Sequence, residues 1–204
     1  MLIVGAGGFA LDFLSSIQLE PVFPDITFFV EESQQATHII QQNFPVINSK
    51  IELQKYFSKV DKKFIVAIGD NKARERIAAE LIALGGEYSS FISSFARIGK
   101  FNEISKKGTI ILHDTLITNG VKIDEGNVIY CKSQFGHFTN IGKYNMISSQ
   151  FTTSSVTIGN YNTFGINAVV KPLINIGDNN MIGIGSVVVK DIGNDCTVKG
   201  NPAK

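Results

Sequence analysis

His137 is the side chain in this sequence best suited to act as a general base. It lies in the segment Phe135-Gly136-His137-Phe138, directly after an apolar residue of a regular repeat. Free imidazole has a pKa of about 6.5, so a histidine can accept a proton from an amine or a hydroxyl group near neutral pH. The freed nucleophile could then attack a thioester carbonyl carbon. The competing interpretation is a histidine with a purely structural role.

The other two histidines indicate no second catalytic or metal-binding group. His38 falls in a polar stretch between expected strands, where a solvated loop residue is the simpler interpretation. His113 stands beside Asp114, which fits a surface pair. Neither lies at ligand spacing from His137, so the sequence predicts no three-histidine zinc centre and no bound metal.

A six-residue repeat surrounds His137 and predicts how it is positioned. Apolar residues recur at every sixth position from Ile158 to Val188 and, in another phase, from Ile117 to Ile147. Such hexads are typical of a parallel β-helix, in which three hexads close one triangular coil and the aliphatic residue points inward. The sequence therefore predicts a β-helix domain over 93–204, with residues about eighteen apart lying one above the other.

The repeat is one residue short beside the position that should lie above His137. Ile147 and Ile158 are eleven residues apart, where two hexads would need twelve. Correcting for this places Ser154, with Ser155 next to it, over His137. Their backbone amides could stabilise the oxyanion formed from a thioester. We assign Ser154 to the catalytic group and Ser155 to the binding of the thioester cofactor.

A strand, a glycine turn and a helix begin the chain. Residues 2–4 are apolar, Gly5, Gly7 and Gly8 follow, and an apolar-periodic segment reaches Ile17. Glycines let backbone amides and a helix N-terminus approach a phosphate closely. A tight turn without a ligand is the alternative interpretation.

Further strands and a helix complete a small α/β domain over 1–92. Strands are expected at 26–30, 46–47, 64–68 and 87–92, with a helix over 71–84. Glu31 and Glu32 end the second strand, where an acidic group commonly accepts hydrogen bonds from a ribose or a base. This length provides only one half of a Rossmann fold, so a nucleotide or nucleotide-linked sugar fits better than a dinucleotide.

Composition excludes several other classes of partner. The chain has 19 Lys and Arg against 18 Asp and Glu, so it has no long-range attraction to nucleic acid or to an anionic membrane. No apolar stretch approaches the roughly 20 residues of a membrane span, and no basic leader is present. Cys131 and Cys196 match no metal or redox spacing, which indicates free thiols. We expect a cytoplasmic protein.

These features together resemble the bacterial sugar acyltransferases. The resemblance rests on the glycine-turn domain, on Ile-Gly pairs at 141, 158 and 176, and on the ending from Gly183 to Asp191 followed by Gly200-Asn201-Pro202-Ala203-Lys204. That family includes sialic acid O-acetyltransferases and N-acetyltransferases of nucleotide-linked 4-amino sugars. It implies a left-handed β-helix, a homotrimer with active sites between subunits, acetyl-CoA as co-substrate and His137 as the catalytic base.

The resemblance also implies binding residues. The nucleotide-sugar side matches Gly5, Gly7, Gly8, Phe9, Glu31 and Glu32. On the acetyl-CoA side, the pantetheine arm would lie against Gly165, Ala168, Gly183 and Gly185, and a CoA phosphate would meet Lys171 or Lys190.

Three positions depart from the family pattern. Phe138 stands where an acidic residue often follows the catalytic histidine, Phe9 occupies a substrate-facing place in the glycine turn, and Ser93-Ser94 replaces a His-Pro pair. We interpret these departures as a changed sugar or a changed tuning of the base.

The sequence thus predicts an acetyl-CoA-dependent N-acetyltransferase of a nucleotide-linked amino sugar, acting in surface glycan or polysaccharide synthesis. Two alternatives stay open. One is an O-acetyltransferase of sialic acid or another sugar, and the other is a non-catalytic trimeric protein that binds nucleotide sugars.

Overall fold

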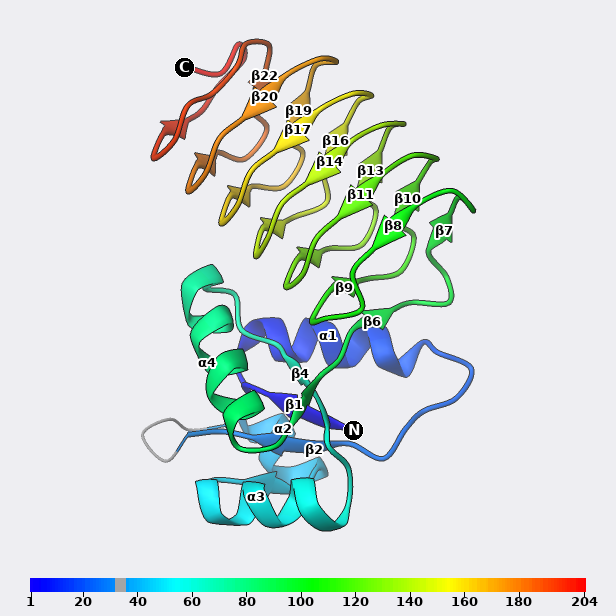
Figure 1. The fold of residues 1–204 in the computed structure, drawn as a ribbon, viewed down its shortest axis with the longest axis vertical. Coiled ribbons are helices and arrows are strands. Elements are labelled where there is room, and N and C mark those ends of the chain that lie inside the picture. Colours follow the sequence, from blue (N-terminus) through cyan, green and yellow to red (C-terminus); the bar gives the residue numbers. More distant parts are fainter. Residues whose placement is uncertain (32–35) are drawn as a thin grey trace. The chain divides into compact units, whose positions relative to one another are not determined.

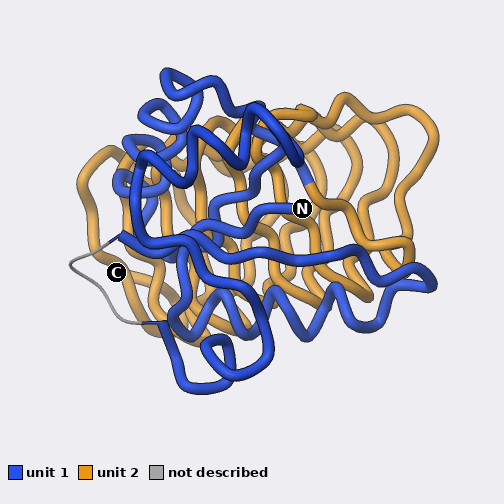
Figure 2. Tube along the Cα trace, turned by 90° about the horizontal axis from the view of Figure 1, so that it is seen from below, with its two compact units in different colours: residues 1–90 blue, residues 91–204 orange. Residues whose placement is uncertain are grey.

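The chain forms two compact units. The computed structural model describes residues 1–31 and 36–204, whose helices and strands are drawn in Figure 1. The first unit is Met1–Ser90 and the second is Phe91–Lys204, shown in two colours in Figure 2. The boundary expected from the sequence lies two residues further along the chain, after residue 92.

The first unit is built on a five-stranded parallel sheet with strand order β3-β2-β1-β4-β5. Its central strand β1 is apolar along its whole length and buried, with Leu2 and Ile3 at 0% exposure, because both faces of such a sheet are covered. The expected strand over 87–92 is in fact two strands in different units. The strands of the sheet are β1 (Leu2–Val4), β2 (Thr27–Phe29), β3 (Val46–Ile47), β4 (Lys63–Val66) and β5 (Glu87–Tyr88).

Among residues 1–31 and 36–90 this unit has four helices, and two of them were not expected. The predicted helices after the glycine turn and over 71–84 are confirmed, but His38 begins a helix and does not lie in a loop. No helix among residues 1–31 and 36–204 has the length and apolar character to cross a membrane. The helices are α1 (Gly8–Gln18), α2 (His38–Asn43), α3 (Lys50–Lys59) and α4 (Asn71–Ala83).

The second unit is a parallel β-helix whose coils each contribute one two-residue strand to each of three sheets. The β7–β22 sheet contains β7 (Arg97–Ile98), β10 (Leu116–Ile117), β13 (Gln134–Phe135), β16 (Phe151–Thr152), β19 (Val169–Val170) and β22 (Val187–Val188). The β8–β20 sheet contains β8 (Glu103–Ile104), β11 (Lys122–Ile123), β14 (Asn140–Ile141), β17 (Thr157–Ile158) and β20 (Asn175–Ile176). The β6–β23 sheet contains β6 (Phe91–Ile92), β9 (Ile110–Ile111), β12 (Val128–Ile129), β15 (Met146–Ile147), β18 (Thr163–Phe164), β21 (Met181–Ile182) and β23 (Thr197–Val198).

The predicted hexad residues fill the interior of the β-helix. In most of these strands the first residue points outward and the second inward, and the inward residues form one core. None of the apolar residues predicted from the six-residue repeat is more than 3% exposed. The missing residue lies between Ile147 and Thr152, which are five apart. Thr152 therefore takes an inward position and pairs with Phe135 in the coil below.

The three edges between the sheets turn through residues with positive φ. At one edge, here called the His137 edge, these residues are Gly120, Phe138, Ser155 and Leu173. The φ angles of the turn residues at all three edges lie between 52° and 75°, except that of Ser149. The N–H of such a residue donates to a carbonyl of the coil below, as from Ser155 to His137 at 2.8 Å. At the short coil the Ser149 hydroxyl donates instead to the Cys131 carbonyl at 2.8 Å. The edge between the β6–β23 and β7–β22 sheets, here called the opposite edge, turns at Asp114, Lys132, Asn167 and Gly185.

A ladder of buried asparagines crosses the coils. Asn127, Asn145, Asn162 and Asn180 share one position in successive coils and are at most 1% exposed. The Asn145 Nδ2 donates to the Asn127 Oδ1 at 3.0 Å and to the Gly159 carbonyl at 2.9 Å. Its Oδ1 accepts from the Asn162 N–H at 2.8 Å. The ladder thus gives partners to the buried side-chain amides of Asn127, Asn145 and Asn162, whereas the Asn180 Nδ2 has none among residues 1–31 and 36–204.

Replacing Asn145 by alanine should leave several of these buried groups without partners. We expect Asn145→Ala to lower the free energy of unfolding by about 2–4 kcal/mol, because each unsatisfied buried group costs about 1–3 kcal/mol. The measurement is denaturant unfolding followed by circular dichroism. The exposed, outward-facing Asn140 gives a matched control, and Asn140→Ala should change stability by less than about 0.5 kcal/mol. Equal effects of the two substitutions would contradict a stabilising ladder.

Candidate functional site

His137 lies on the His137 edge, in the turn between β13 and β14, and its side chain is exposed. The backbone around it is fixed from the coil above, because the Gly136 N–H donates to the Thr152 carbonyl at 2.9 Å and the His137 carbonyl accepts from Ser155. The ring of His137 meets that of Phe138 edge-on, with centroids 5.1 Å apart. The imidazole is therefore held on a rigid turn where a substrate can reach it.

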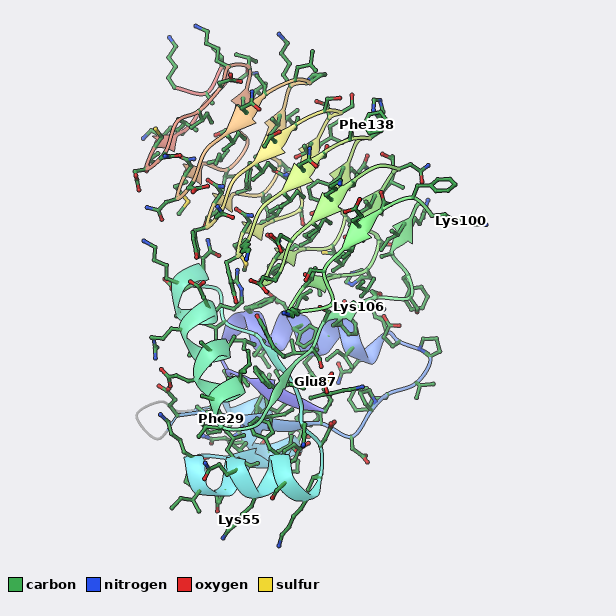
Figure 3. The ribbon with its side chains drawn as sticks, viewed as in Figure 1. Phe29, Lys55, Glu87, Lys100, Lys106 and Phe138 are labelled. Carbon is green, nitrogen blue, oxygen red and sulfur yellow. The ribbon has the colours of Figure 1, made fainter. Side chains whose placement is uncertain are left out.

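The backbone of Phe138 has a left-handed conformation, with φ at 58°. Its ring lies over Gly120 in the coil below, where an added Cβ would come within 2.6 Å of the phenyl Cδ1. Figure 3 shows Phe138 at the edge of the β-helix, pointing away from the interior, and its side chain is 64% exposed. Gly120 is thus needed for this ring, and Phe138 supplies no charge to the histidine.

Ser154 occupies the same position as His137 in the coil above, since Phe135 pairs with Thr152. The two backbones approach so closely that a Cβ on Gly136 would lie 2.7 Å from the Ser154 nitrogen. Ser155 cannot supply an oxyanion donor, because its N–H already bonds to the His137 carbonyl. The Ser154 N–H has no acceptor among residues 1–31 and 36–204, so of the two expected donors only this amide is available.

Lys171 and Lys190 lie on the same edge in later coils. The register of β13, β16, β19 and β22 places Lys171 above Gly136 and Thr153, and Lys190 above His137, Ser154 and Pro172. Both lysines are exposed. With parallel strands about 4.8 Å apart, the backbone of Lys190 is about 14 Å from that of His137.

The remaining residues expected to bind acetyl-CoA lie elsewhere in the β-helix. Gly165, Gly183 and Gly185 belong to the opposite edge, so one chain does not bring them to His137. A Cβ on Gly165 would meet the Ile184 nitrogen at 2.7 Å, which explains this glycine by coil packing. Ala168 was wrongly assigned, because its side chain is 0% exposed and belongs to the core.

No metal site accompanies these residues. Within the described part of the chain, no three His, Cys, Asp or Glu side chains lie close enough together to hold a metal ion. His113 lies on the opposite edge, in the strand position below Cys131.

The glycine turn of the first unit lies where the strand order reverses, between β1 and β4. In open α/β sheets this point forms a crevice that binds ligands. Gly5 is explained by packing, because its φ is 101° and an added Cβ would lie 2.9 Å from the Ala67 carbonyl oxygen and 2.8 Å from the Ile68 side chain. Gly7 and Gly8 are exposed, with nothing within 4 Å of an added Cβ.

The same crevice offers groups suited to a phosphate and a nucleoside. The first turn of α1 has no acidic side chain, and its N-cap Gly7 makes no side-chain cap, so the positive end of the helix dipole can attract an anion. Glu31, just after β2, is half-buried, whereas Glu32 lies outside the described residues. The Phe9 ring lies 6.5 Å from that of Phe13 on the same helix.

Sequence reasoning missed Thr37 as a possible contact in this crevice. Its N–H donates to the Ala6 carbonyl in the glycine turn at 3.2 Å, and its buried Oγ1 has no partner among the described residues. Thr37 directly precedes helix α2, and it was missed because this segment was interpreted as a loop.

The first unit is similar to a known family of domains. Residues 1–81 match the profile of the PglD N-terminal domain. A shorter stretch of 49 residues is 43% identical to galactoside O-acetyltransferase of Escherichia coli (strain K12), and it covers 24% of each chain.

Solved structures match the whole chain. The acetyltransferase domain of PglB from Neisseria gonorrhoeae FA1090 is 24% identical, with a TM-score of 0.87 over 100% of this chain and 97% of that one. A histidine-to-asparagine variant of perosamine N-acetyltransferase from Caulobacter crescentus, in complex with CoA and GDP-perosamine, is 22% identical, with a TM-score of 0.76 over 100% and 94%. WeeI from Acinetobacter baumannii AYE is 20% identical, with a TM-score of 0.72 over 100% and 97%.

These matches confirm the predicted fold class, an α/β unit followed by a left-handed β-helix. Residues 1–81 are similar to the PglD N-terminal domain, and the whole chain shares the fold of the acetyltransferase domain of PglB and of perosamine N-acetyltransferase.

Proposed function

We propose that this protein is an acetyl-CoA-dependent N-acetyltransferase acting on a nucleotide-linked amino sugar. The observation that carries the proposal is the exposed His137 beneath the unoccupied amide of Ser154, in a chain that also carries a PglD N-terminal domain. The two free cysteines, Cys131 and Cys196, suit the cytoplasm, where acetyl-CoA and nucleotide sugars are made.

In this mechanism His137 accepts a proton from the neutral sugar amine as the amine nitrogen attacks the thioester carbonyl carbon. A new C–N bond forms, and the carbonyl oxygen becomes an oxyanion that the Ser154 N–H stabilises. The C–S bond then breaks. The CoA sulfur leaves as a thiolate and takes the proton from the His137 imidazolium, which restores the base.

The lysines of the His137 edge fit the other end of acetyl-CoA. Lys190 lies in the same column as His137 and Ser154, about three strand spacings away. A pantetheine arm that follows the edge from His137 would bring the CoA phosphates toward this ammonium group and that of Lys171. We propose these two lysines as phosphate ligands.

Replacing His137 tests the base directly. We expect His137→Ala to lower kcat for acetyl transfer to amino-sugar nucleotides by about 10²–10⁴, the usual contribution of a general base. The assay follows thiol release from acetyl-CoA with UDP- and GDP-linked amino sugars, and it includes sialic acid and galactosides as acceptors for the O-acetyl alternative. His38→Ala is the matched control and should leave kcat unchanged. A kcat for His137→Ala within about threefold of wild type would sink the assignment.

An apolar face supports assembly into a homotrimer. The outward residues of the β7–β22 sheet include Leu116 and Phe151, which are 37% and 45% exposed. Further large apolar side chains are exposed on the two edges that flank this sheet. They are Phe138 and Leu173 on the His137 edge, and Ile166 and Ile184 on the opposite edge. A patch of this kind is typical of a protein–protein interface.

A cyclic arrangement would also complete the acetyl-CoA site. If the β7–β22 sheets of three copies face one axis, the His137 edge of each copy meets the opposite edge of the next, and such a ring closes. Gly183 and Gly185 of the partner subunit would then face His137. Such an arrangement would bring together the residues expected to bind acetyl-CoA, which lie on two different edges of a single chain.

A charge in the centre of this face should break the assembly. We expect Phe151→Glu to give monomers, because three carboxylates would be desolvated near the axis. Sedimentation velocity measures the change, and acetyl transfer should fall with it. The control is Asn140→Glu, an exposed position on the β8–β20 sheet, which should stay trimeric. A monomeric wild type, or a trimeric Phe151→Glu, would refute the proposed interface.

Gly7 tests the nucleotide crevice separately from the β-helix. An added Cβ there has nothing within 4 Å, so Gly7→Ala should leave the melting temperature unchanged. We expect it to weaken binding of a nucleotide sugar by about tenfold, because the methyl group keeps a phosphate away from the backbone amides. Titration calorimetry gives the Kd, with Gly193→Ala, an equally open position in the second unit, as the control. Equal Kd values for wild type and Gly7→Ala would argue against this crevice as the site.

A further inference from the structure

We propose that residues 68–71, the end of the loop after β4 together with the first residue of α4, form the second wall of the nucleotide crevice and that Arg74 is the positioning residue that fixes the shape of this wall. The inference deepens the proposed function and rests on it. It adds a binding element on the β4 side, whereas the glycine turn provides the β1 side.

The loop and the glycine turn leave neighbouring strands at the same end. Val4 pairs with Val66, and the Ala67 N–H donates to the Val4 carbonyl at 2.8 Å. The close approach of Gly5 to Ala67 and Ile68 shows that the two turns are packed together from their first residues. Because the strand order reverses between β1 and β4, the turns that follow diverge and flank one crevice.

Arg74 holds this loop from inside the unit. Its side chain is 0% exposed, which is rare for arginine unless its guanidinium group is well hydrogen-bonded. The Nη1 donates to the Ile68 carbonyl at 2.9 Å and to the Gly69 carbonyl at 3.3 Å, and the Nη2 donates to the Asn71 Oδ1 at 3.0 Å. One planar group thus fixes two residues of the loop and the first residue of α4.

The geometry of these bonds determines which groups face a ligand. The carbonyl oxygens of Ile68 and Gly69 are directed toward Arg74, while Gly69 and Asp70 themselves are exposed. Asp70 caps α4 by accepting from the Ala73 N–H at 2.7 Å through Oδ1. Its other carboxylate oxygen can accept a hydrogen bond from a ribose hydroxyl or a base N–H. The expected ligand class is therefore the nucleoside diphosphate part of the substrate.

Lysine cannot replace this arginine, although it carries the same charge. An ammonium group lacks the rigid planar fork that reaches three acceptors at once. We expect Arg74→Lys to weaken binding of a nucleoside diphosphate about tenfold and to raise the KM for the nucleotide sugar about as much. The kcat at saturating substrate and the KM for acetyl-CoA should stay within about twofold of wild type, because the β-helix site is untouched.

Arg76 provides the matched control on the same helix. It is exposed and pairs with Glu80 at 2.8 Å. Titration calorimetry of the full-length protein with UDP and with GDP compares wild type, Arg74→Lys and Arg76→Lys. The expected result is weaker binding by Arg74→Lys alone. Equal affinity of all three proteins overturns the role of Arg74, whereas a wild type that binds neither nucleotide overturns the proposed function and this inference with it.

Hydrogen exchange of the wild type tests the loop without any variant, so it remains decisive if Arg74→Lys does not fold. Binding of the better nucleotide should slow exchange of the amides in 68–71 as well as those in the glycine turn. Protection of the glycine turn alone would leave nucleotide binding intact and overturn the second wall.

Discussion

The stacking of one coil on the next is the constraint on which the rest of the β-helix depends. Parallel strands about 4.8 Å apart bring the backbones of successive coils into contact, so glycine recurs directly after the strands and residues with positive φ recur within the turns. The same spacing puts the backbone of Ser154 against Gly136 and lets the Ser155 N–H bond to the His137 carbonyl. The hydrogen bonds that hold the coils together therefore also fix the histidine and decide which amide beside it stays available.

In the first unit, backbones approach each other closely at the reversal of strand order. Gly5 is needed because the turns after β1 and β4 touch, and this contact sets the two walls of the crevice. The buried guanidinium of Arg74 then shapes the second wall from behind. In the proposed function, backbone packing thus positions amides in both units. The β-helix presents an amide to an oxyanion, and the crevice presents amides to a phosphate.

Much of the fold could be predicted because each signal was local. The hexads from Ile117 to Val188 gave the inward residues directly, and the missing residue was detected from the spacing of Ile147 and Ile158 alone. Helices α2 and α3 were missed, since the short α2 lacks a side-chain cap and α3 is signalled mainly by Ser49, which caps it. Ala168 was misassigned because a small residue beside a turn can face either the core or a ligand, and spacing does not separate the two.

The sequence by itself determined the repeat and the glycine turn, since these depend on residue type and period. It also distinguished His137 from the other two histidines by its place in the repeat. Only the tertiary structure decided that the Ser155 amide is occupied while that of Ser154 is not, and that Lys190 lies in the column of His137. It also decided that the expected acetyl-CoA residues fall on two edges and that Arg74 is buried. Hydrogen-bond partners and burial are set by residues distant along the chain, so no local pattern encodes them.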